Sequence, residues 1–338
     1  MATPVLKIDN LRTYIRQRKA LVRAVDGVSL TIEQGETVGL VGESGSGKSM
    51  TAMSILRLLP PGGFIAEGSV RLGDTDLVRL HEDDMRQVRG NDVSVVFQDP
   101  MTSLNPTMTI GNQIAESLRI HRGWNRSQAM SRAEDVLGVV GMPRPKERLN
   151  QYAHQLSGGL RQRVMIAMAL ACEPRLLIAD EPTTALDVTI QAQILTLLDS
   201  LKREFKMAVL LITHDLGVIA GRADRVCVMY AGKIVEEAPI DALFSATQHP
   251  YAEALLQSIP KPDQDQSEPL YSIPGLPPDL IRPPGGCRFH PRCRYVTEQC
   301  RTREPRLEAD DSTHLYACYH PVGGGRPSRA AAEESVAG

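Results

Sequence analysis

Four short runs of apolar residues dominate the hydrophobic pattern of this chain. They cover residues 37–41, 93–97, 176–179 and 209–213, and polar side chains rarely interrupt them. Continuous apolar runs of this length are typical of strands that are buried on both faces of a parallel sheet. The pattern therefore predicts an α/β fold in which helices cover both faces of the sheet.

Helical patterns lie between these runs. Residues 48–59 have helical character and stop at the Pro-Pro-Gly-Gly sequence that follows them. After Asp187, apolar residues at Ile190, Ile194 and Leu201 mark one face of another helix. Residues 99–155 also read as mainly helical, so we expect a helical subdomain inserted at about residues 99–165.

A polar residue with useful chemistry follows three of the apolar runs. Gln98 follows the second run, Asp180 and Glu181 follow the third, and His214 follows the fourth. In open α/β sheets, ligands bind beyond the carboxyl ends of the strands. We therefore expect these side chains to gather at one edge of the sheet, beside the glycine-rich loop that follows the first run.

The composition narrows the class of protein. The 338 residues are 42% hydrophobic and 23% charged, which fits one large globular α/β domain with an appendage, or two ordinary domains. The net charge of −2 argues against a nucleic-acid binder, because such proteins carry a basic excess. No apolar stretch approaches the roughly 20 residues that span a bilayer, and the N-terminus lacks a signal peptide's apolar core. We expect a cytosolic protein that reaches a membrane through a partner.

A glycine-rich loop follows the first apolar run and precedes a helix, which is the arrangement that binds phosphates. Its glycines let backbone N–H groups surround the phosphates, Lys48 reaches the β- and γ-phosphates, and the Ser49 hydroxyl coordinates Mg²⁺. The sequence contains no guanine-reading Asn-Lys-x-Asp motif, so ATP is the expected nucleotide. The loop residues are Gly42, Glu43, Ser44, Gly45, Ser46, Gly47, Lys48 and Ser49.

The polar residues at the strand ends are candidates for catalysis. Asp180 is the expected second contact to Mg²⁺, and Glu181 can act as a general base on the attacking water. Gln98 can ligate Mg²⁺ or orient that water. His214 can hydrogen-bond the terminal phosphate. The ordinary alternative for each is a structural polar group at a strand end.

A second glycine element lies at Ser157, Gly158 and Gly159, before a helix that begins near Leu160. Its hydroxyl and backbone N–H groups can cap the helix and also bind an anion. Because one phosphate loop already surrounds the triphosphate, we expect this element to face the nucleotide of another copy. Residues 185–187 would then line the crossing point between the two copies.

This set of motifs closely resembles the ATP-binding subunits of ABC transporters. Residues 42–49 resemble Walker A, Gln98 the Q-loop, and residues 156–162 the signature, which adds Gln162 to the candidate nucleotide-binding residues. Residues 176–181 resemble Walker B with its catalytic glutamate, residues 185–187 the D-loop, and His214 the switch histidine. The resemblance implies a P-loop NTPase (RecA-like) cassette with an inserted helical subdomain, working as a head-to-tail dimer around two ATPs.

The resemblance covers about residues 5–250. We expect the cassette at residues 1–255, a proline-rich extension with four cysteines at 256–322, and a disordered tail at 323–338. In this family an N-terminal aromatic residue stacks on adenine. Tyr14 is the candidate here, although Ile15 occupies a nearby position where relatives carry the aromatic.

Finer features resemble the peptide/nickel importer group, notably residues 96–106, residues 161–170 and the sequence His249-Pro250-Tyr251. The resemblance implies peptide import, and import of nickel or another small solute is the alternative. It also implies a second ATPase subunit, usually a related one, two membrane permeases, and an extracytoplasmic binding protein that acts indirectly. The chain would lie peripherally on the cytoplasmic face of the inner membrane. The less favoured alternatives are a soluble ABC ATPase outside transport and a cassette that only binds ATP.

Four cysteines crowd the C-terminal region at Cys287, Cys293, Cys300 and Cys318. The tight cysteine pairs of structural zinc sites are missing, and cytosolic disulfides are disfavoured. Four thiolates are what a [4Fe–4S] cluster requires, and nearby arginines at 288, 292, 294, 301 and 303 could offset its charge. The sequence of residues 286–293 also resembles the extension of peptide-importer ATPases, in which such a cluster is implied. We therefore predict a [4Fe–4S] cluster, with zinc or free or paired thiols as alternatives.

Overall fold

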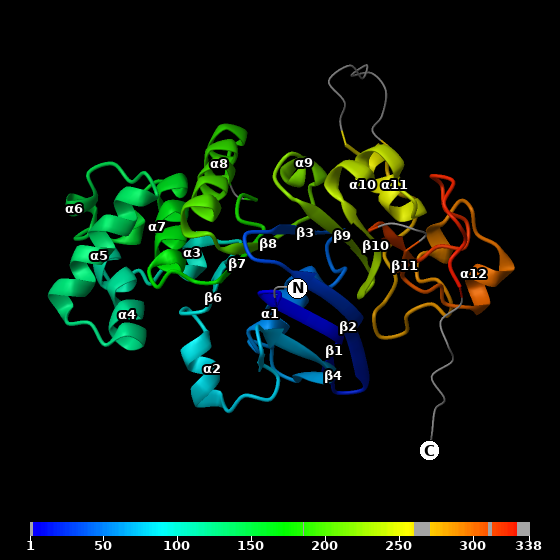
Figure 1. The fold of residues 1–338 in the computed structure, drawn as a ribbon, viewed down its shortest axis with the longest axis horizontal. Coiled ribbons are helices and arrows are strands. Elements are labelled where there is room, and N and C mark those ends of the chain that lie inside the picture. Colours follow the sequence, from blue (N-terminus) through cyan, green and yellow to red (C-terminus); the bar gives the residue numbers. More distant parts are fainter. Residues whose placement is uncertain (1–2, 185, 260–270, 310–312, 330–338) are drawn as a thin grey trace. The chain divides into compact units, whose positions relative to one another are not determined.

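The computed structural model describes residues 3–184, 186–259, 271–309 and 313–329. The chain folds as two compact units, each built from several segments of the sequence (Figure 1). The first unit comprises Met1–Lys7, Thr31–Thr37 and Arg71–Ile212. The second unit comprises Ile8–Leu30, Val38–Val70 and Thr213–Gly338.

A parallel sheet with the strand order β8-β7-β6 forms the core of the first unit. Leu176 pairs with both Val93 and Ala208, and the strand residues are almost all buried. The structure thus confirms the buried strands predicted from three of the apolar runs. Their bounds are β6 (Val93–Val96), β7 (Leu176–Asp180) and β8 (Ala208–Thr213).

Helices between β6 and β7 pack together in the first unit. α4 contacts α5 and α7, and α5 contacts α6 and α7 (Figure 1). α4 ends at Gly123 in the left-handed conformation, and α5 begins with a capping box formed by Asn125 and Gln128. The bounds are α3 (Pro100–Ser103), α4 (Ile110–Arg122), α5 (Arg126–Val139), α6 (Pro145–Arg148), η1 (Ala153–Gln155) and α7 (Gly158–Leu170).

Two further helices and a short strand complete the first unit. α8 confirms the helix predicted after Asp187, and it buries Ile194, Leu198 and Leu201 on one face. Arg71 and Leu72 at the end of β4 pair with β5. The bounds are β5 (Thr75–Asp76), α2 (Glu82–Val88) and α8 (Val188–Phe205).

The second unit contains most of two sheets. One has the strand order β2-β1-β4, and the other has the order β11-β12-β10-β9-β3, in which β3 and β9 are parallel. The bounds are β1 (Leu6–Gln17), β2 (Ala20–Ile32), β3 (Thr37–Val41), β4 (Gly63–Leu72), β9 (Arg225–Tyr230), β10 (Lys233–Pro239), β11 (Glu308–Ala309) and β12 (Leu315–Tyr316).

The helix after the glycine-rich loop is shorter than its sequence pattern predicts. α1 spans Lys48–Ile55, whereas the pattern extends to residue 59. Arg57 adopts a φ of 52°. The N–H of Arg57 donates to the carbonyl of Ser54, and the N–H of Leu58 donates to the carbonyl of Met53. These two bonds form a Schellman motif, which ends the helix before the prolines are reached.

The C-terminal extension joins the second unit by strand pairing. β12 lies antiparallel to β10, with Tyr316 opposite Glu236. Residues 260–270 of the predicted proline-rich segment and residues 330–338 of the predicted tail lie outside the described residues. The remaining helices are α9 (Leu216–Ile219), α10 (Ile240–Ala246), α11 (Pro250–Gln257), η2 (His290–Arg292) and α12 (Glu298–Thr302). None of the helices in the described part of the chain has the length and apolar character needed to cross a bilayer.

Candidate functional site

The glycine-rich loop at residues 42–49, called the phosphate loop below, joins β3 to α1 in the second unit. Gly42 and Gly47 have φ values of 151° and 109°. A Cβ atom at Gly42 would overlap the carbonyl oxygen of Met229, and one at Gly47 would overlap that of Ala24. Glycine is therefore required at both positions, because the backbone is twisted and neighbouring chain lies too close for a side chain.

Polar groups of the phosphate loop are arranged as a ligand cradle. Lys48 is buried, and its Nζ donates to the carbonyl oxygens of Gly42 and Glu43 at 2.7 and 3.0 Å. The buried Ser46 hydroxyl has no hydrogen-bond partner among the described residues. Ser44, Gly45 and Ser49 are exposed. An orphaned hydroxyl, a glycine cradle and the N-terminus of α1 together fit a bound triphosphate.

Gln98 and Glu181 come together in the first unit, as their positions after neighbouring strands predict. Gln98 Nε2 donates to Glu181 Oε2 at 2.9 Å, and the Thr184 hydroxyl donates to the same oxygen at 2.9 Å. Glu181 has a φ of 48°, and its N–H donates to the carbonyl of Ile212 at 2.9 Å. A left-handed glutamate at a strand end is a strained arrangement of the kind that clusters at functional sites.

Asp180 and His214 occupy the strand ends at which the sequence places them. Asp180 is the buried last residue of β7, in the first unit. His214 follows β8 immediately and is an exposed residue of the second unit. The oxygen atoms of Ser49, Gln98 and Asp180 are the ligand type that Mg²⁺ prefers.

The second glycine element opens α7. Ser157 is its N-cap, and the hydroxyl accepts a hydrogen bond from Leu160 N. Ser157 and Gly158 are exposed, so this helix start is open to a ligand or a second chain. Gln162 differs, because its side chain is buried, and its Nε2 has no hydrogen-bond partner in the described part of the chain.

The predicted crossing residues are described only in part. Asp187 is the N-cap of α8 and accepts a hydrogen bond from Ile190 N at 2.9 Å. Ala185 lies outside the described residues, so the structure describes Leu186 and Asp187 alone of this group.

Tyr14, the candidate for adenine stacking, is half-buried on β1. Its hydroxyl donates to Asp26 Oδ1 at 2.8 Å, and its ring meets Phe64 edge-on, with centroids 6.2 Å apart. Burial, followed by the hydrogen bond to Asp26, raises the pKa of Tyr14. Sequence reasoning missed Asp26 and Phe64, because nothing local to Tyr14 indicates them.

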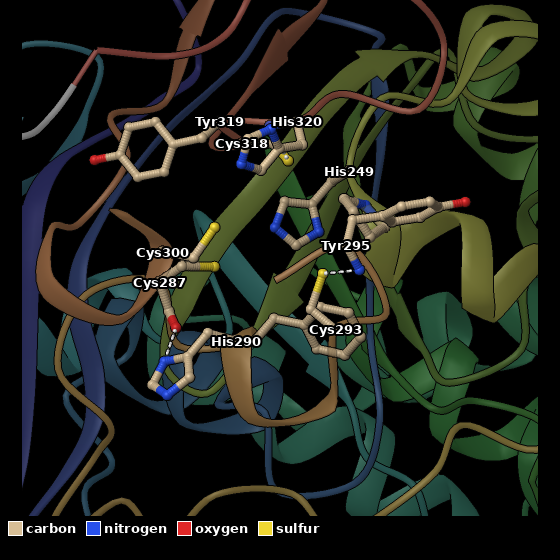
Figure 2. Close-up of a pocket in the computed structure, with 11 residues that line it drawn as sticks. His249, Cys287, His290, Cys293, Tyr295, Cys300, Cys318, Tyr319 and His320 are labelled. Carbon is tan, nitrogen blue, oxygen red and sulfur yellow. Dashed lines mark hydrogen bonds between the residues drawn. The ribbon is translucent and has the colours of Figure 1, made fainter. Parts of the chain in front are cut away.

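The four C-terminal cysteines line a single pocket in the second unit, called the four-cysteine pocket below (Figure 2). Backbone N–H groups of Tyr295 and His320 lie 3.4 and 3.3 Å from the sulfurs of Cys293 and Cys318. Burial raises the pKa of the Cys287 thiol to about 12. The other pocket residues are His249, Pro250, Phe289, His290, Cys300 and Tyr319.

The prediction of a [4Fe–4S] cluster is wrong. In the ranges that the structure describes, no group of three or more His, Cys, Asp or Glu side chains is placed to hold a metal ion. Burial raises the pKa values of Cys287 and Cys318 to about 12, and such desolvation disfavours the thiolate form from which a cluster site is built. Two of the five arginines expected to offset cluster charge are engaged elsewhere, because Arg288 pairs with Asp26 and Arg292 with Glu43.

Arg294 shows the same pattern, since it pairs with Glu253 at 2.7 Å. The same finding applies to the zinc alternative, because the described residues offer no set of three or more ligands for a metal ion.

Comparison with known proteins identifies two regions of the chain. The family described as "ABC transporter" matches residues 25–184. The family described as "Oligopeptide/dipeptide transporter, C-terminal region" matches residues 235–300, which include part of the four-cysteine pocket.

Relatives cover nearly the whole chain. It is 51% identical over 316 residues to "Oligopeptide transport ATP-binding protein AppD" of Bacillus subtilis, which covers 93% of this chain and 96% of the relative. It is 48% identical over 325 residues to "Dipeptide transport ATP-binding protein DppD" of Escherichia coli, which covers 96% and 99%.

A solved structure shares the fold. It is the dimeric post-hydrolysis state of the ATP-binding cassette MJ0796 bound to ADP and Pi, with a TM-score of 0.62 and 30% identity, covering 70% of this chain and 98% of that one. With the P-loop-type sheet and the relatives above, this likeness shows that the chain belongs to the ATP-binding subunits of ABC transporters, in the oligopeptide/dipeptide transporter family.

Proposed function

We propose that this chain is the ATP-hydrolysing subunit that powers import of di- and oligopeptides by a membrane ABC transporter. The observation that carries the proposal is the phosphate loop, in which two glycines are required sterically and the buried Ser46 hydroxyl has no partner among the described residues. The names of the relatives, which are oligopeptide and dipeptide transport ATP-binding proteins, support the peptide cargo.

Each candidate residue has a role in this proposal. Backbone N–H groups of the phosphate loop and Lys48 bind the phosphates of ATP, and Tyr14 contacts the adenine. Glu181 takes a proton from the attacking water, and Gln98 orients the Glu181 carboxylate. His214 donates a hydrogen bond to the terminal phosphate.

Three side chains would hold Mg²⁺, namely Ser49, Gln98 and Asp180. The ion would neutralise charge on the phosphates, and the chain's own groups would perform the remaining steps. The glycines of the phosphate loop bring backbone donors close to the same phosphates.

A second cassette completes the proposed reaction centre. Ser157, Gly158 and Gly159 would contact the nucleotide held by the other copy, with residues 185–187 at the crossing point. The exposed start of α7 supports this role, and the MJ0796 cassette to which this chain is similar is described as dimeric. The buried Gln162, which lies on the same helix α7, would belong to this nucleotide-binding element.

The assembly would place the chain peripherally on the cytoplasmic face of the inner membrane. Two permeases and a second, related cassette would be its direct partners, and an extracytoplasmic binding protein would act through the permeases. The segment after Gln98, which includes the exposed Met101, would contact a permease.

Reconstitution tests the proposal. The chain is co-expressed with its membrane partners, placed in lipid vesicles, and assayed for ATP-dependent uptake of labelled dipeptide, oligopeptide and Ni²⁺. Uptake of peptide that stops on loss of ATP supports the proposal. Uptake of Ni²⁺ alone would show that the transported substrate is nickel and not peptide. ATP hydrolysis without any membrane partner or transport would favour a soluble ABC ATPase.

A further inference from the structure

One segment of the C-terminal extension carries two buried arginines, Arg288 and Arg292. Phe289 lies between them in the sequence and packs on the rings of Tyr230 and Tyr251, with centroids 5.2 and 5.4 Å away. The segment also contributes Cys287, Phe289, His290 and Cys293 to the four-cysteine pocket (Figure 2). The aromatic packing fixes the direction in which both arginines extend.

Arg292 forms a two-point ion pair with Glu43 of the phosphate loop. Its Nη1 donates to Oε2 at 2.6 Å, and its Nη2 donates to Oε1 at 3.0 Å. The Arg292 side chain is only 4% exposed, and its Nε donates to the carbonyl of Pro274 at 2.9 Å. A planar guanidinium held on both sides in this way sets the orientation of the carboxylate that it binds.

Glu43 transmits that orientation to the phosphate-binding lysine. Its N–H donates to the Tyr251 hydroxyl at 2.8 Å, and its carbonyl oxygen accepts from Lys48 Nζ at 3.0 Å. The side chain, N–H and carbonyl of one loop residue are therefore all engaged. A shift of Glu43 would move the loop backbone and the partner of Lys48 together.

Arg288 makes a similar connection to Tyr14, the candidate for adenine stacking, through Asp26. It donates to the Asp26 carboxylate and to the carbonyl of Ala231, and both members of the ion pair are buried. Asp26 in turn accepts the hydrogen bond from Tyr14. Burial by itself would raise the pKa of Asp26. The charge of Arg288 and the hydrogen bond from Tyr14 outweigh burial, so the pKa is lowered overall and the carboxylate stays ionised.

We propose that Arg292 is a positioning residue for ATP binding, because through Glu43 it holds the phosphate loop in the shape that receives the phosphates. The inference rests on the proposed function, since it requires that this loop binds ATP. It assigns the C-terminal extension, 249 residues away in sequence, a part in setting the ATP affinity of the cassette.

Nucleotide binding and turnover test this role. MgATP affinity is measured on the purified full chain, and KM and kcat are measured on the assembled transporter. Arg292→Met is expected to raise Kd and KM for ATP about tenfold, in line with the loss of a charge-assisted hydrogen bond. We expect kcat at saturating ATP to stay within about twofold, because the chemical groups are unchanged.

The chain supplies a matched control two residues away. Arg294 also forms an ion pair, with Glu253 at 2.7 Å, but its side chain is 49% exposed and its other interaction among the described residues is with the Tyr295 ring. Arg294→Met is therefore expected to leave Kd and KM for ATP unchanged.

A double-mutant cycle separates positioning from general stability. If Arg292 acts through Glu43, the variant with both Arg292→Met and Glu43→Gln binds ATP no more weakly than the weaker single variant. Arg292→Lys keeps the charge without the planar two-point contact and is expected to lose affinity to a smaller extent. Should thermal unfolding show that Arg292→Met does not fold, Arg292→Lys and Glu43→Gln carry the same test.

The outcomes distinguish this inference from the proposed function. Unchanged Kd and KM in the Arg292 variants, or losses that simply add in the double variant, would overturn the positioning role while ATP hydrolysis remains. A wild-type chain that binds no MgATP would overturn the proposed function itself.

Discussion

The phosphate loop and the four-cysteine pocket lie in the same unit and are built in opposite ways. The loop leaves Ser44 and Gly45 exposed, and its buried Ser46 hydroxyl lacks a partner among the described residues. The pocket buries Cys318 and half-buries Cys287, and this desolvation raises the pKa values of both thiols. Residue types alone therefore do not make a ligand site, because the surroundings decide which groups are exposed and able to bind.

The variant with the greatest predicted loss of activity tests whether ATP hydrolysis depends on the strand-end carboxylate of Glu181 and not on the pocket. Glu181→Gln is expected to lower kcat for ATP about 10²–10⁴-fold, because an amide cannot accept the proton of the attacking water. ATP binding should persist, and the closed dimer should accumulate when ATP is present. Steady-state hydrolysis measures the fall in kcat, and light scattering in the presence of ATP measures the dimer.

Glu173→Gln is the control for this variant, because Glu173 is an exposed glutamate of the same unit that pairs with Arg132. Its hydrolysis rate should match that of the wild type. Unchanged turnover in Glu181→Gln would remove this residue as the base.

Two glycine variants test how closely the neighbouring chain approaches the phosphate loop. Gly42→Ala should lower the free energy of unfolding by about 3 kcal/mol, because a disfavoured φ costs about 1–2 kcal/mol and overpacking adds a similar amount. Gly45 also has a positive φ of 79°, but a Cβ there would meet nothing within 4 Å. Gly45→Ala should therefore cost only about 1–2 kcal/mol.

Denaturant unfolding measures both glycine variants, and MgATP binding should weaken more in Gly42→Ala. Equal effects at the two positions would contradict the close approach of Met229 to the loop.

A smaller effect is expected in the four-cysteine pocket. Cys318→Ser should lower the free energy of unfolding by about 1–2 kcal/mol, because a hydroxyl is costlier to bury than a thiol unless it finds a hydrogen-bond partner. KM for ATP should not change. Chemical denaturation and hydrolysis assays measure the two properties separately. A loss of ATP affinity equal to that of the loop variants would show that the pocket also controls nucleotide binding.

The smallest expected effect is a loss of stability at alkaline pH. The pKa of Cys318 is raised from 9.0 to about 12 by burial, so the folded protein holds a proton that the unfolded chain releases. Stability from this thiol is complete below pH 9 and falls as the pH rises toward 12, by at most about 1.4 kcal/mol per pH unit.

Thermal unfolding at intervals between pH 8 and 10 measures that slope. Cys318→Ser should make the slope shallower, because serine does not titrate in this range. An unchanged slope in the variant would show that other groups account for the alkaline loss.

Local sequence signals predicted the strands and the loop successfully. Continuous apolar runs identified β3, β6, β7 and β8, and the Ser157 cap was expected from its place before a helix. The end of α1 was misjudged, because Arg57 adopts a left-handed conformation in a Schellman motif that its residue type does not indicate. The proximity of Gln98 and Glu181 was also predictable, because neighbouring parallel strands end at one edge.

The sequence by itself determined the element order, the glycine cradle and the family, because hydrophobic periodicity, capping and motif spacing are short-range properties. Tertiary structure decided the burial of the cysteines and the partners of the arginines. Burial depends on everything that packs around a thiol, and an ion pair such as Arg292 with Glu43 joins residues 249 positions apart. Such partners are determined by the folded structure, so arginines that lie beside the cysteines in the sequence bind carboxylates of the cassette.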